Sequence, residues 1–388
     1  MRIYLDYNAT APVHPEVVEV MARLLRDHFG NASSVHSFGQ ASKTIVDDAR
    51  SLVAALIDAD ASDVVCTSGG TESDNFAIRG AAETMAAAGR RHLIASGIEH
   101  EAVLATLKAL ERRGWTVDLL SAGETGIVSQ EALRNALRPD TALVSVMHAN
   151  NEIGTIQPVA ELAALAHAGG ALFHTDAVQS AGKIPVSVRA LGVDLLSLSG
   201  HKFGGPKGVG ALWIRRGVKL TPLMTGGRQE RNRRAGTENV PGIGGLGAAA
   251  RIARDRLAGN GPAIASLRDS LERRILDTVR GTTVNGRTDA RIPNTSNISF
   301  DGLEAESLLI ALDLEGIAVS TGSACSSGSL EPSHVLRAMG LPHARARNSL
   351  RFSLGPETTP AEVEAVASAL PPLVARLRRL TQRAVALR

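Results

Sequence analysis

The segment that decides how this chain folds is Ser197-Leu198-Ser199-Gly200-His201-Lys202-Phe203-Gly204-Gly205-Pro206-Lys207-Gly208. The alternating residues 193–199 predict a strand that enters a buried sheet, and the apolar residues 209–214 predict the next one. Lys202 therefore lies at a strand end among small residues that leave open space. A lysine that loses hydration there holds its proton less tightly, and its neutral amine can attack a carbonyl. A lone turn lysine more often points into solvent, so Lys202 needs support from the rest of the chain.

The composition indicates an ordinary soluble enzyme. The 388 residues are enough for two domains, and a net charge of only +3 gives no electrostatic support for a nucleic-acid partner. No apolar run reaches transmembrane length, and the first residues lack the pattern of a signal peptide. The two cysteines, Cys66 and Cys325, lie far apart and fit a reducing compartment. We therefore expect a cytoplasmic protein with no membrane partner.

Strand and helix patterns alternate over the first two thirds of the chain. Because each connection is long enough for a crossover, the pattern predicts an α/β fold with a mostly parallel sheet covered by helices on both faces. The expected strands are 64–67, 92–95, 117–120, 143–147, 171–174 and 193–199. A helix over 241–257 should leave this sheet, and Gly259-Asn260-Gly261 is the best internal break. The sequence thus predicts a large domain over 14–258 and a smaller α+β domain formed by 1–13 and 259–388.

Polar residues gather at the expected strand ends, where ligands of such sheets bind. These positions are Gly70-Thr71, His100, Asn150-Asn151-Glu152, Asp176 with Gln179, and Ser199-His201-Lys202. The turn Ser68-Gly69-Gly70-Thr71 joins a strand to a helix, so its free N–H groups suit a phosphate. Plain helix capping explains that turn about as well. Five strand ends with related chemistry nevertheless indicate one shared site.

Pyridoxal 5'-phosphate (PLP) requires a lysine, a carboxylate for its ring nitrogen and a phosphate cradle. Lys202 and Asp176 meet the first two needs. His100, at a helix start, could stack on the ring or shuttle a proton. The candidates for the phosphate cradle are Gly70, Thr71, Ser199 and His201.

The second expected domain contributes a thiol and an arginine. Cys325 lies in a small, polar segment over 321–329, as suits an accessible nucleophile, whereas Cys66 lies in an apolar strand and reads as a core residue. Arg351, on an expected strand, could clamp a substrate carboxylate. The arginine-rich loop over 215–245 fits an anion contact and a subunit bridge about equally well.

Several motifs together resemble the cysteine desulfurases of the NifS/IscS type, in the class V aminotransferase family. The resemblance runs almost end to end, and Gly322-Ser323-Ala324-Cys325-Ser326-Ser327-Gly328-Ser329-Leu330-Glu331-Pro332, its most specific part, resembles the long catalytic loop of the group I branch. The glycine-rich segment 30–36 is closer to the NifS side. The other motifs are Leu5-Asp6-Tyr7-Asn8-Ala9-Thr10-Ala11-Pro12, Thr67-Ser68-Gly69-Gly70-Thr71-Glu72-Ser73-Asp74-Asn75, His148-Ala149-Asn150-Asn151-Glu152-Ile153-Gly154, His174-Thr175-Asp176-Ala177-Val178-Gln179-Ser180, Ser199-Gly200-His201-Lys202-Phe203 and Arg234-Ala235-Gly236-Thr237-Glu238-Asn239.

The resemblance implies a fold-type I, PLP-dependent homodimer that converts L-cysteine to L-alanine and holds the sulfur as a persulfide on Cys325. It implies that the sulfur passes to an iron–sulfur scaffold or another acceptor protein. It implies no intrinsic metal site and allows Cys325 to be a transient iron–sulfur ligand shared with a scaffold. The resemblance implies that Lys202 binds PLP, Asp176 holds the ring nitrogen, Gln179 holds the ring hydroxyl, and His100 stacks on the ring and acts as acid or base. It implies that the phosphate is held by Gly70, Thr71, Ser199 and His201, and that Thr237 reaches the other subunit's phosphate. It also implies that Asn151 and Arg351 hold the substrate carboxylate, with Asn151 beside the cofactor as well.

Two other interpretations of the function stay open at this point. A selenocysteine lyase or an aminotransferase would use the same scaffold, and an aminotransferase would not need Cys325. A non-enzymatic protein that presents Cys325 to acceptors would leave Lys202 and Asp176 unexplained. The motifs leave open whether the sulfur serves nitrogenase clusters, general iron–sulfur assembly or tRNA thiolation.

Overall fold

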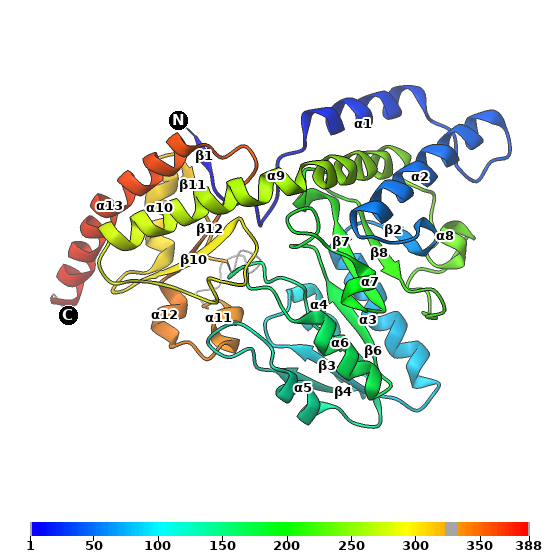
Figure 1. The fold of residues 1–388 in the computed structure, drawn as a ribbon, viewed down its shortest axis with the longest axis horizontal. Coiled ribbons are helices and arrows are strands. Elements are labelled where there is room, and N and C mark those ends of the chain that lie inside the picture. The colour runs from blue at the N-terminus through cyan, green and yellow to red at the C-terminus, as the bar shows by residue number, and fades with distance from the viewer. Residues whose placement is uncertain (1, 323–331, 387–388) are drawn as a thin grey trace.

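The computed structural model describes residues 2–322 and 332–386, and a seven-stranded sheet forms its larger part (Figure 1). The strand order is β2-β8-β7-β6-β5-β3-β4. Strand β8 runs antiparallel to both neighbours and the other pairs are parallel, which confirms the mostly parallel sheet. The strands are β2 (Val64–Thr67), β3 (His92–Ser96), β4 (Thr116–Leu120), β5 (Thr141–Ser145), β6 (Leu172–Asp176), β7 (Leu195–Ser199) and β8 (Gly210–Ile214).

Helices cover both faces of this sheet. Successive residues of β3 show this, because Ile94 packs into one apolar cluster while Leu93 and Ala95 pack into another. Strands buried on both faces read as continuous apolar runs, as the apolar residues 209–214 around β8 do. The helices of this part are α1 (Pro15–Asp27), α2 (Ser37–Leu56), α3 (Gly70–Ala86), α4 (Glu101–Glu111), α5 (Gln130–Ala136), α6 (Val159–Ala168), α7 (Val188–Leu191) and α8 (Gln229–Asn232), with short 3₁₀ turns η1 (Ala61–Asp63) and η2 (Gly200–Lys202).

A smaller part has its own antiparallel sheet and its own apolar cluster. Strands β12 (Ser349–Ser353), β10 (Thr295–Phe300) and β9 (Thr282–Val284) lie side by side in that order, and β1 (Ile3–Tyr4) pairs with β11 (Ile317–Ala318) in parallel. The helices are α10 (Ala305–Leu314), α11 (His334–Ala338), α12 (His343–Arg347) and α13 (Pro360–Ala386). Thr359 and Glu362 form a capping box at the start of α13.

One helix, α9 (Val240–Thr278), joins the two parts and corrects a prediction. We expected a break at Gly259-Asn260-Gly261, but the helix continues through these residues and through Pro262 (Figure 1). Its first half packs on α1 and α2, and its second half places Ile264 and Leu271 in the small cluster. Packing at both ends therefore overrides the weak helix propensity of the middle. The domain boundary at residue 259 stays a prediction.

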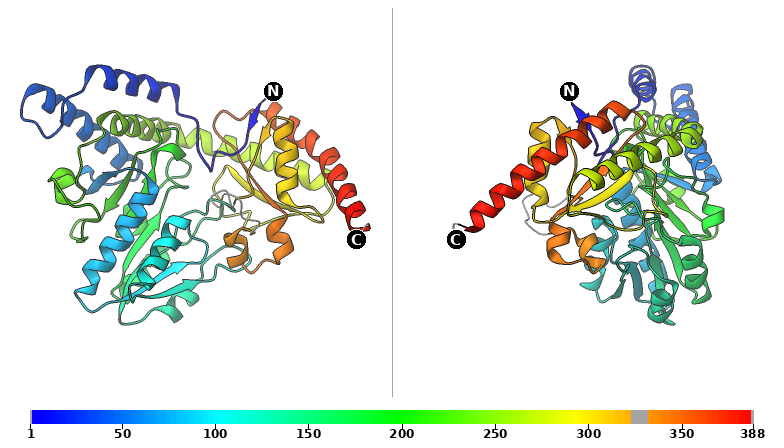
Figure 2. Two further views of the ribbon diagram at one scale, coloured as in Figure 1. Left: turned by 180° about the vertical axis from the view of Figure 1, so that it is seen from behind. Right: turned by 60° about the vertical axis from the view of Figure 1, so that its left-hand side comes forward.

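The N-terminal arm runs from the small part to the large one, as Figure 2 shows from behind. Ile3 pairs with Ile317 in the small part, whereas Ala11 donates its N–H to the carbonyl of His201 at 2.8 Å in the large part. Strand β6 ends at Asp176, two residues later than expected, and β5 begins at Thr141, two residues earlier. Among the described residues, no helix combines the length and apolar character needed to cross a membrane.

Candidate active site

Lys202 ends the 3₁₀ turn that follows β7, and its side chain points into the protein. Its Nζ donates to the backbone carbonyls of Asn8 at 2.6 Å and Ala9 at 2.9 Å. The arm that offers these carbonyls is itself tied to the turn, since His14 donates its N–H to the carbonyl of Gly204 at 2.9 Å. The alternative of a turn lysine in solvent is therefore excluded.

Asp176 and His100 face the same region as Lys202. Asp176 is the last residue of β6 and is buried, and its Oδ1 accepts the Val178 N–H at 2.8 Å. Burial raises the pKa of this carboxyl, and the charges of His100 and Lys202 oppose the rise. His100 caps α4 by accepting the Ala102 N–H on Nδ1 at 3.1 Å, so the proton of its neutral ring lies on Nε2. Burial lowers the pKa of His100, which keeps the ring neutral near pH 7.

Two of the four candidates for the phosphate cradle, Gly70 and Ser199, lie together at the start of α3. A Cβ on Gly70 would lie 2.9 Å from Val178 Cγ2 and 3.6 Å from Ser199 Cβ, so the helix start, the end of β6 and the end of β7 meet there. His201 Nδ1 lies 3.2 Å from Thr10 Oγ1. Burial, together with the positive charges of Lys202, Lys207 and Lys183, lowers the pKa of His201 to about 4. Thr71, in the first turn of α3, is exposed.

Gln179 and two residues that the sequence did not single out form a polar group beside Lys202. Gln179 Nε2 donates to the Asn8 carbonyl at 3.0 Å, and Lys183 Nζ donates to Gln179 Oε1 at 2.7 Å and to Asn8 Oδ1 at 2.8 Å. Asn8 is 1% exposed and also binds the small part, since Asn294 Nδ2 donates to its Oδ1 at 2.9 Å. Asn8 belongs to a motif that carried the resemblance, but no role was assigned to it or to Lys183.

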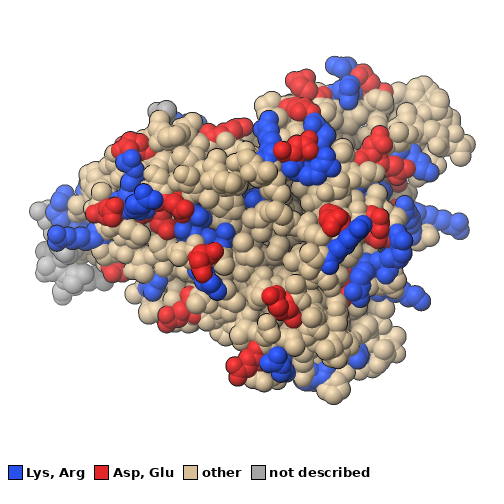
Figure 3. All heavy atoms as spheres, in the orientation of Figure 1, with Lys and Arg blue, Asp and Glu red and all other residues tan. Residues whose placement is uncertain are grey.

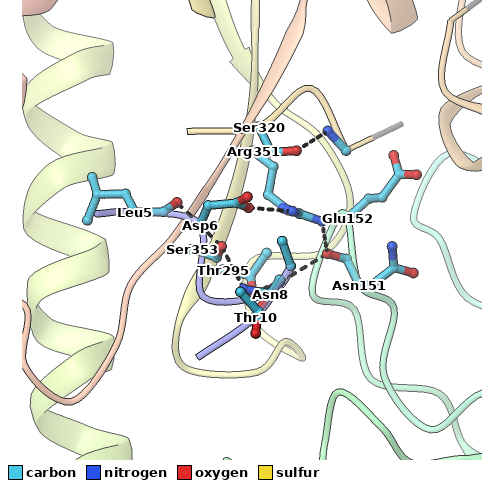
Figure 4. A network of polar contacts seen from close by, with 12 residues as sticks. Leu5, Asp6, Asn8, Thr10, Asn151, Glu152, Thr295, Ser320, Arg351 and Ser353 are labelled. Carbon is cyan, nitrogen blue, oxygen red and sulfur yellow. Dashed lines mark hydrogen bonds and ion pairs between the residues drawn. The ribbon is translucent and has the colours of Figure 1, made fainter. Parts of the chain in front are cut away.

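Arg351 projects from β12 toward the arm and toward the turn after β5 (Figure 4). Its Nη2 donates to Asp6 Oδ1 at 2.6 Å and its Nη1 donates to the Asn151 carbonyl at 3.0 Å. The buried Arg351 Nε and Asn151 Oδ1 have no hydrogen-bond partner among the described residues. Arg351 and Asn151 therefore lie together, as expected, and each keeps a polar atom for a ligand. The pairing of Arg351 with Asp6 was not predicted.

Glu152 is a further buried residue that the sequence placed only within a group of strand-end residues. Its carboxylate accepts a hydrogen bond from the Ser333 hydroxyl, and a Cβ on Gly322 would lie 2.6 Å from Glu152 Oε2. Gly322 has a φ of +86°, a conformation that favours glycine. The carboxylate thus contacts the residues that flank 323–331. Cys325 itself lies outside the described residues.

Thr237 lies in the loop between α8 and α9. It is exposed and lines a cavity of about 230 Å³ together with Ser68 and Gly208. The loop that carries it is fixed to α3, because Arg234 Nε donates to Glu72 Oε1 at 2.8 Å. Lys202 does not line the cavity that Thr237 shares with Ser68.

Cys66 is the core residue that the sequence indicated. It lies in β2 opposite Ala211 and is buried. Burial raises the pKa of its thiol to about 12, so almost no thiolate forms near neutral pH. Across residues 2–322 and 332–386, no cluster of three histidine, cysteine or acidic side chains could hold a metal ion.

The donors and charges around Lys202 fit PLP. A buried carboxyl with a raised pKa favours a cationic neighbour, as a protonated ring nitrogen would provide beside Asp176. His201 is half-buried, and burial together with the positive charges of three lysines lowers its pKa, so this place favours an anion such as a phosphate. Gly70 adds a helix start with free N–H groups.

Comparisons with known proteins agree with this site. The Aminotransferase class-V model matches residues 3–366. A cysteine desulfurase of Gluconacetobacter diazotrophicus is 50% identical over 98% of this chain and 95% of its own length. The chain belongs to the aminotransferase class-V family and, within it, to the cysteine desulfurases.

Other relatives of this cysteine desulfurase lead to the same family. The cysteine desulfurase IscS of Methanosarcina thermophila is 48% identical over 98% of this chain and 93% of its own length. The solved structure of a NifS-like protein superposes with a TM-score of 0.91 at 37% identity, covering 97% of this chain and all of that one. The protein is a PLP-dependent enzyme with the expected fold-type I architecture.

Proposed function

We propose that this cysteine desulfurase converts L-cysteine to L-alanine at Lys202 and carries the sulfur away as a persulfide on Cys325. The observation that supports it most is the meeting of Lys202, Asp176 and His100, which come from three different elements and influence one another's ionisation. The large domain over 14–258 would hold the cofactor, and the small domain over 1–13 and 259–388 would supply Arg351 and Cys325.

PLP supplies an electron sink that stabilises negative charge on the substrate carbon. Lys202 would hold it covalently, and Asp176 would keep its ring nitrogen protonated. Gln179 would donate to the ring hydroxyl oxygen, and His100 would stack on the ring. The residues that would hold the phosphate are Gly70, Thr71, Ser199 and His201, with Thr237 from the other subunit.

The substrate would lie between the two parts of the chain. Its carboxylate would meet the guanidinium of Arg351 and the side chain of Asn151. The guanidinium already donates a hydrogen bond to the backbone carbonyl of Asn151. The amine of Lys202, once free, would take the proton from the substrate Cα. His100, neutral and with its proton on Nε2, can donate a proton to a leaving group. Each such positioned proton transfer typically contributes about 10²–10⁴-fold to the rate.

The sulfur transfer balances without an outside oxidant. The Cys325 thiolate attacks the substrate sulfur, so that an S–S bond forms and the substrate C–S bond breaks. The bonding pair of the C–S bond stays with the substrate carbon, which becomes the methyl group of alanine on protonation. A thiol acceptor can then take the outer sulfur from Cys325.

The experiment that tests this proposal is mass spectrometry after incubation with L-cysteine. We expect a sulfur adduct on the peptide 321–337 that carries Cys325, together with release of alanine. Cys325→Ala should keep the colour of the bound cofactor and lose the adduct and most alanine release. Wild-type turnover by Cys325→Ala, or an adduct on Cys66 instead, would reject this part of the proposal. The same assay with selenocysteine identifies a lyase if Cys325→Ala is active on it.

The homodimer is proposed on two observations. Large apolar side chains are exposed at the tip between α1 and α2, where Val35 is 92% and Phe29 is 78% exposed. This tip carries few charges, at the upper right of Figure 3, whereas charges of both signs are interspersed elsewhere on that face. Thr237 and Asn31 line one cavity beside this tip. A second copy that docked on the tip would therefore contact Thr237. Sedimentation should show a dimer, and a fully active monomer would contradict it.

The sulfur acceptor is proposed to be an iron–sulfur scaffold or another thiol-bearing protein in the cytoplasm. The name of the Methanosarcina relative, IscS, supports a place in iron–sulfur cluster assembly. Cys325 would be a transient iron–sulfur ligand shared with that scaffold. A purified scaffold should gain sulfur from the labelled persulfide of Cys325 and not from Cys325→Ala.

A further inference from the structure

Lys183 joins the site through two side-chain amides and has no part in the chemistry described so far. A lysine Nζ can only donate hydrogen bonds while protonated, and a neutral amine can still donate two. Lys183 Nζ donates to Gln179 Oε1 at 2.7 Å and to Asn8 Oδ1 at 2.8 Å. Both amides turn their oxygen atoms toward Lys183 and their NH₂ groups away from it.

The orientation of Gln179 has a direct consequence at Lys202. With its oxygen held by Lys183, Gln179 presents Nε2 to the Asn8 carbonyl at 3.0 Å. Lys202 Nζ donates to the same carbonyl oxygen at 2.6 Å. The amide NH₂ and the cofactor-binding amine thus converge on one acceptor. A flipped amide would place its oxygen against that carbonyl oxygen, which is repulsive.

The second amide, that of Asn8, connects this arrangement to the small part of the protein. Asn8 Nδ2 donates to the Asn151 carbonyl at 3.0 Å and to Thr295 Oγ1 at 2.8 Å, and its own backbone N–H donates to Ser353 Oγ at 3.0 Å. Lys183 therefore orders a residue whose side-chain amide bonds β10 and whose backbone N–H bonds β12.

The charge environment shows that Lys183 is not an ordinary surface lysine. Burial lowers the pKa of its amine well below the usual value, and the positive charges of Lys202 and Arg351 lower it further. A second amine close to Lys202 is unfavourable because like charges repel, and the hydrogen bonds of Lys183 to Gln179 and Asn8 offset this cost. Donation to Gln179 survives loss of the charge, since the neutral amine keeps two N–H groups.

We infer that Lys183 is a positioning residue that sets the Gln179 side-chain amide as a hydrogen-bond donor to the ring oxygen of the cofactor held by Lys202. This inference rests on the proposed attachment of PLP to Lys202. A donor at that oxygen stabilises its negative charge, most strongly when the neighbouring nitrogen has lost its proton. The pH at which the visible band of the bound cofactor changes by half is therefore lower with the donor than without it.

The test measures that midpoint pH in purified holoenzymes. Lys183→Met has nearly the shape of lysine without a donor and should raise the midpoint by about half to one pH unit, the scale of one hydrogen bond to a charged oxygen. Gln179→Leu should raise it similarly. In the double variant the two shifts should not add, because Lys183 acts through Gln179. Additive shifts would show that Lys183 acts only by its charge and would overturn the inference.

Two further variants keep the test decisive. Lys183→Gln retains an N–H donor without the charge and should keep the midpoint pH near the wild-type value. A midpoint raised by about half to one pH unit in Lys183→Gln would overturn the inference. This comparison can be made even if Lys183→Met folds poorly. Lys108→Met removes an exposed lysine of α4 that no described hydrogen bond joins to Gln179 and should leave the midpoint nearly unchanged. A visible band that survives Lys202→Ala would instead reject the cofactor lysine itself.

Discussion

The large sheet and the small sheet both supply groups to the site, but they leave those groups in different electrostatic states. In the large part, burial raises the pKa of Asp176 and lowers that of His201, so each group carries its charge at a cost. In the small part, Arg351 is already neutralised by Asp6 at 2.6 Å and is held by the Asn151 carbonyl. Asp176 and His201 would be stabilised by ligand groups of suitable charge, whereas the charge of Arg351 is already balanced by Asp6.

The two parts therefore contribute to the site in different ways. Groups on the large sheet lie at strand ends, where their chemistry depends on the cofactor that they hold. The Arg351 guanidinium depends on the N-terminal arm, whose Asp6 lies 345 residues away in the chain. Changes in the large part should therefore alter the cofactor, and changes at the arm should alter folding stability and substrate affinity together.

The largest expected effect is at Lys202, in the large part. Lys202→Ala should remove the covalent attachment of PLP and the base that takes the Cα proton, and turnover should fall by about 10⁴-fold or more. Absorbance after dialysis and alanine release measure the two losses. Lys207→Ala, five residues further along the same loop, is the matched control and should stay yellow and active. Borohydride reduction that attached the cofactor to Lys207 would contradict the assignment.

The next effect concerns Asp6, in the arm. Asp6→Asn leaves the Arg351 charge buried without its anion, and we expect the free energy of unfolding to fall by about 3 kcal/mol. The KM for cysteine should rise as Arg351 shifts, while the visible band of the cofactor should stay unchanged. Urea unfolding, steady-state kinetics and absorbance measure the three quantities.

The control for Asp6 is an ion pair at the surface. Arg26 and Asp27 pair at 3.0 Å with side chains that are 73% and 45% exposed, so Asp27→Asn should have almost no effect on stability. If Asp6→Asn behaved like Asp27→Asn, the arm would not support Arg351.

The sequence could predict the large part well for a physical reason. Strand-end residues such as Asp176 and Lys202 are placed by local chain order, since parallel strands bring their carboxyl ends to one edge. The structure confirms that they lie in one region. The break at Gly259-Asn260-Gly261 was wrong because contacts of α9 at both ends, and not local propensity, decide its length.

The small part and the arm could not be predicted to the same depth. The Asp6–Arg351 pair and the bonds of Lys183 to Asn8 join residues 345 and 175 positions apart. No periodic pattern carries such pairings. Glu152 lay in a recognised motif, but only the structure shows that its carboxylate contacts both Gly322 and Ser333.

A smaller effect is expected in the large part, where His148 should make the free energy of unfolding depend on pH. His148 is buried against Ser180 Oγ at 2.9 Å, and burial lowers its pKa to about 4. Because an unfolded histidine binds its proton near pH 6.5, the neutral His148 contributes stability above that pH, and this contribution is lost as the pH falls toward 4. Between pH 7 and 5, wild type should lose about 2 kcal/mol more than His148→Asn.

The difference between the two proteins is the quantity that matters, because other groups titrate in the same range. Burial raises the pKa of Glu99 to about 8, which favours the folded state at low pH and opposes the effect of His148. Glu99 is common to both proteins and cancels in the comparison. Parallel stability curves for wild type and His148→Asn would show that His148 is not the source.

The smallest effect is expected at Cys66, the cysteine of the large part. Its thiol is buried in β2, and burial raises its pKa to about 12, so it should neither accept sulfur nor be needed for turnover. Cys66→Ala removes one buried sulfur atom and should lower the free energy of unfolding by about 1 kcal/mol through a small cavity. Activity and the adduct on peptide 321–337 should stay at wild-type levels, whereas Cys325→Ala should lose the adduct with stability unchanged. If Cys66→Ala also lost the adduct, the two cysteines would share the sulfur, and the division between a cofactor-holding large part and a sulfur-carrying small part would fail.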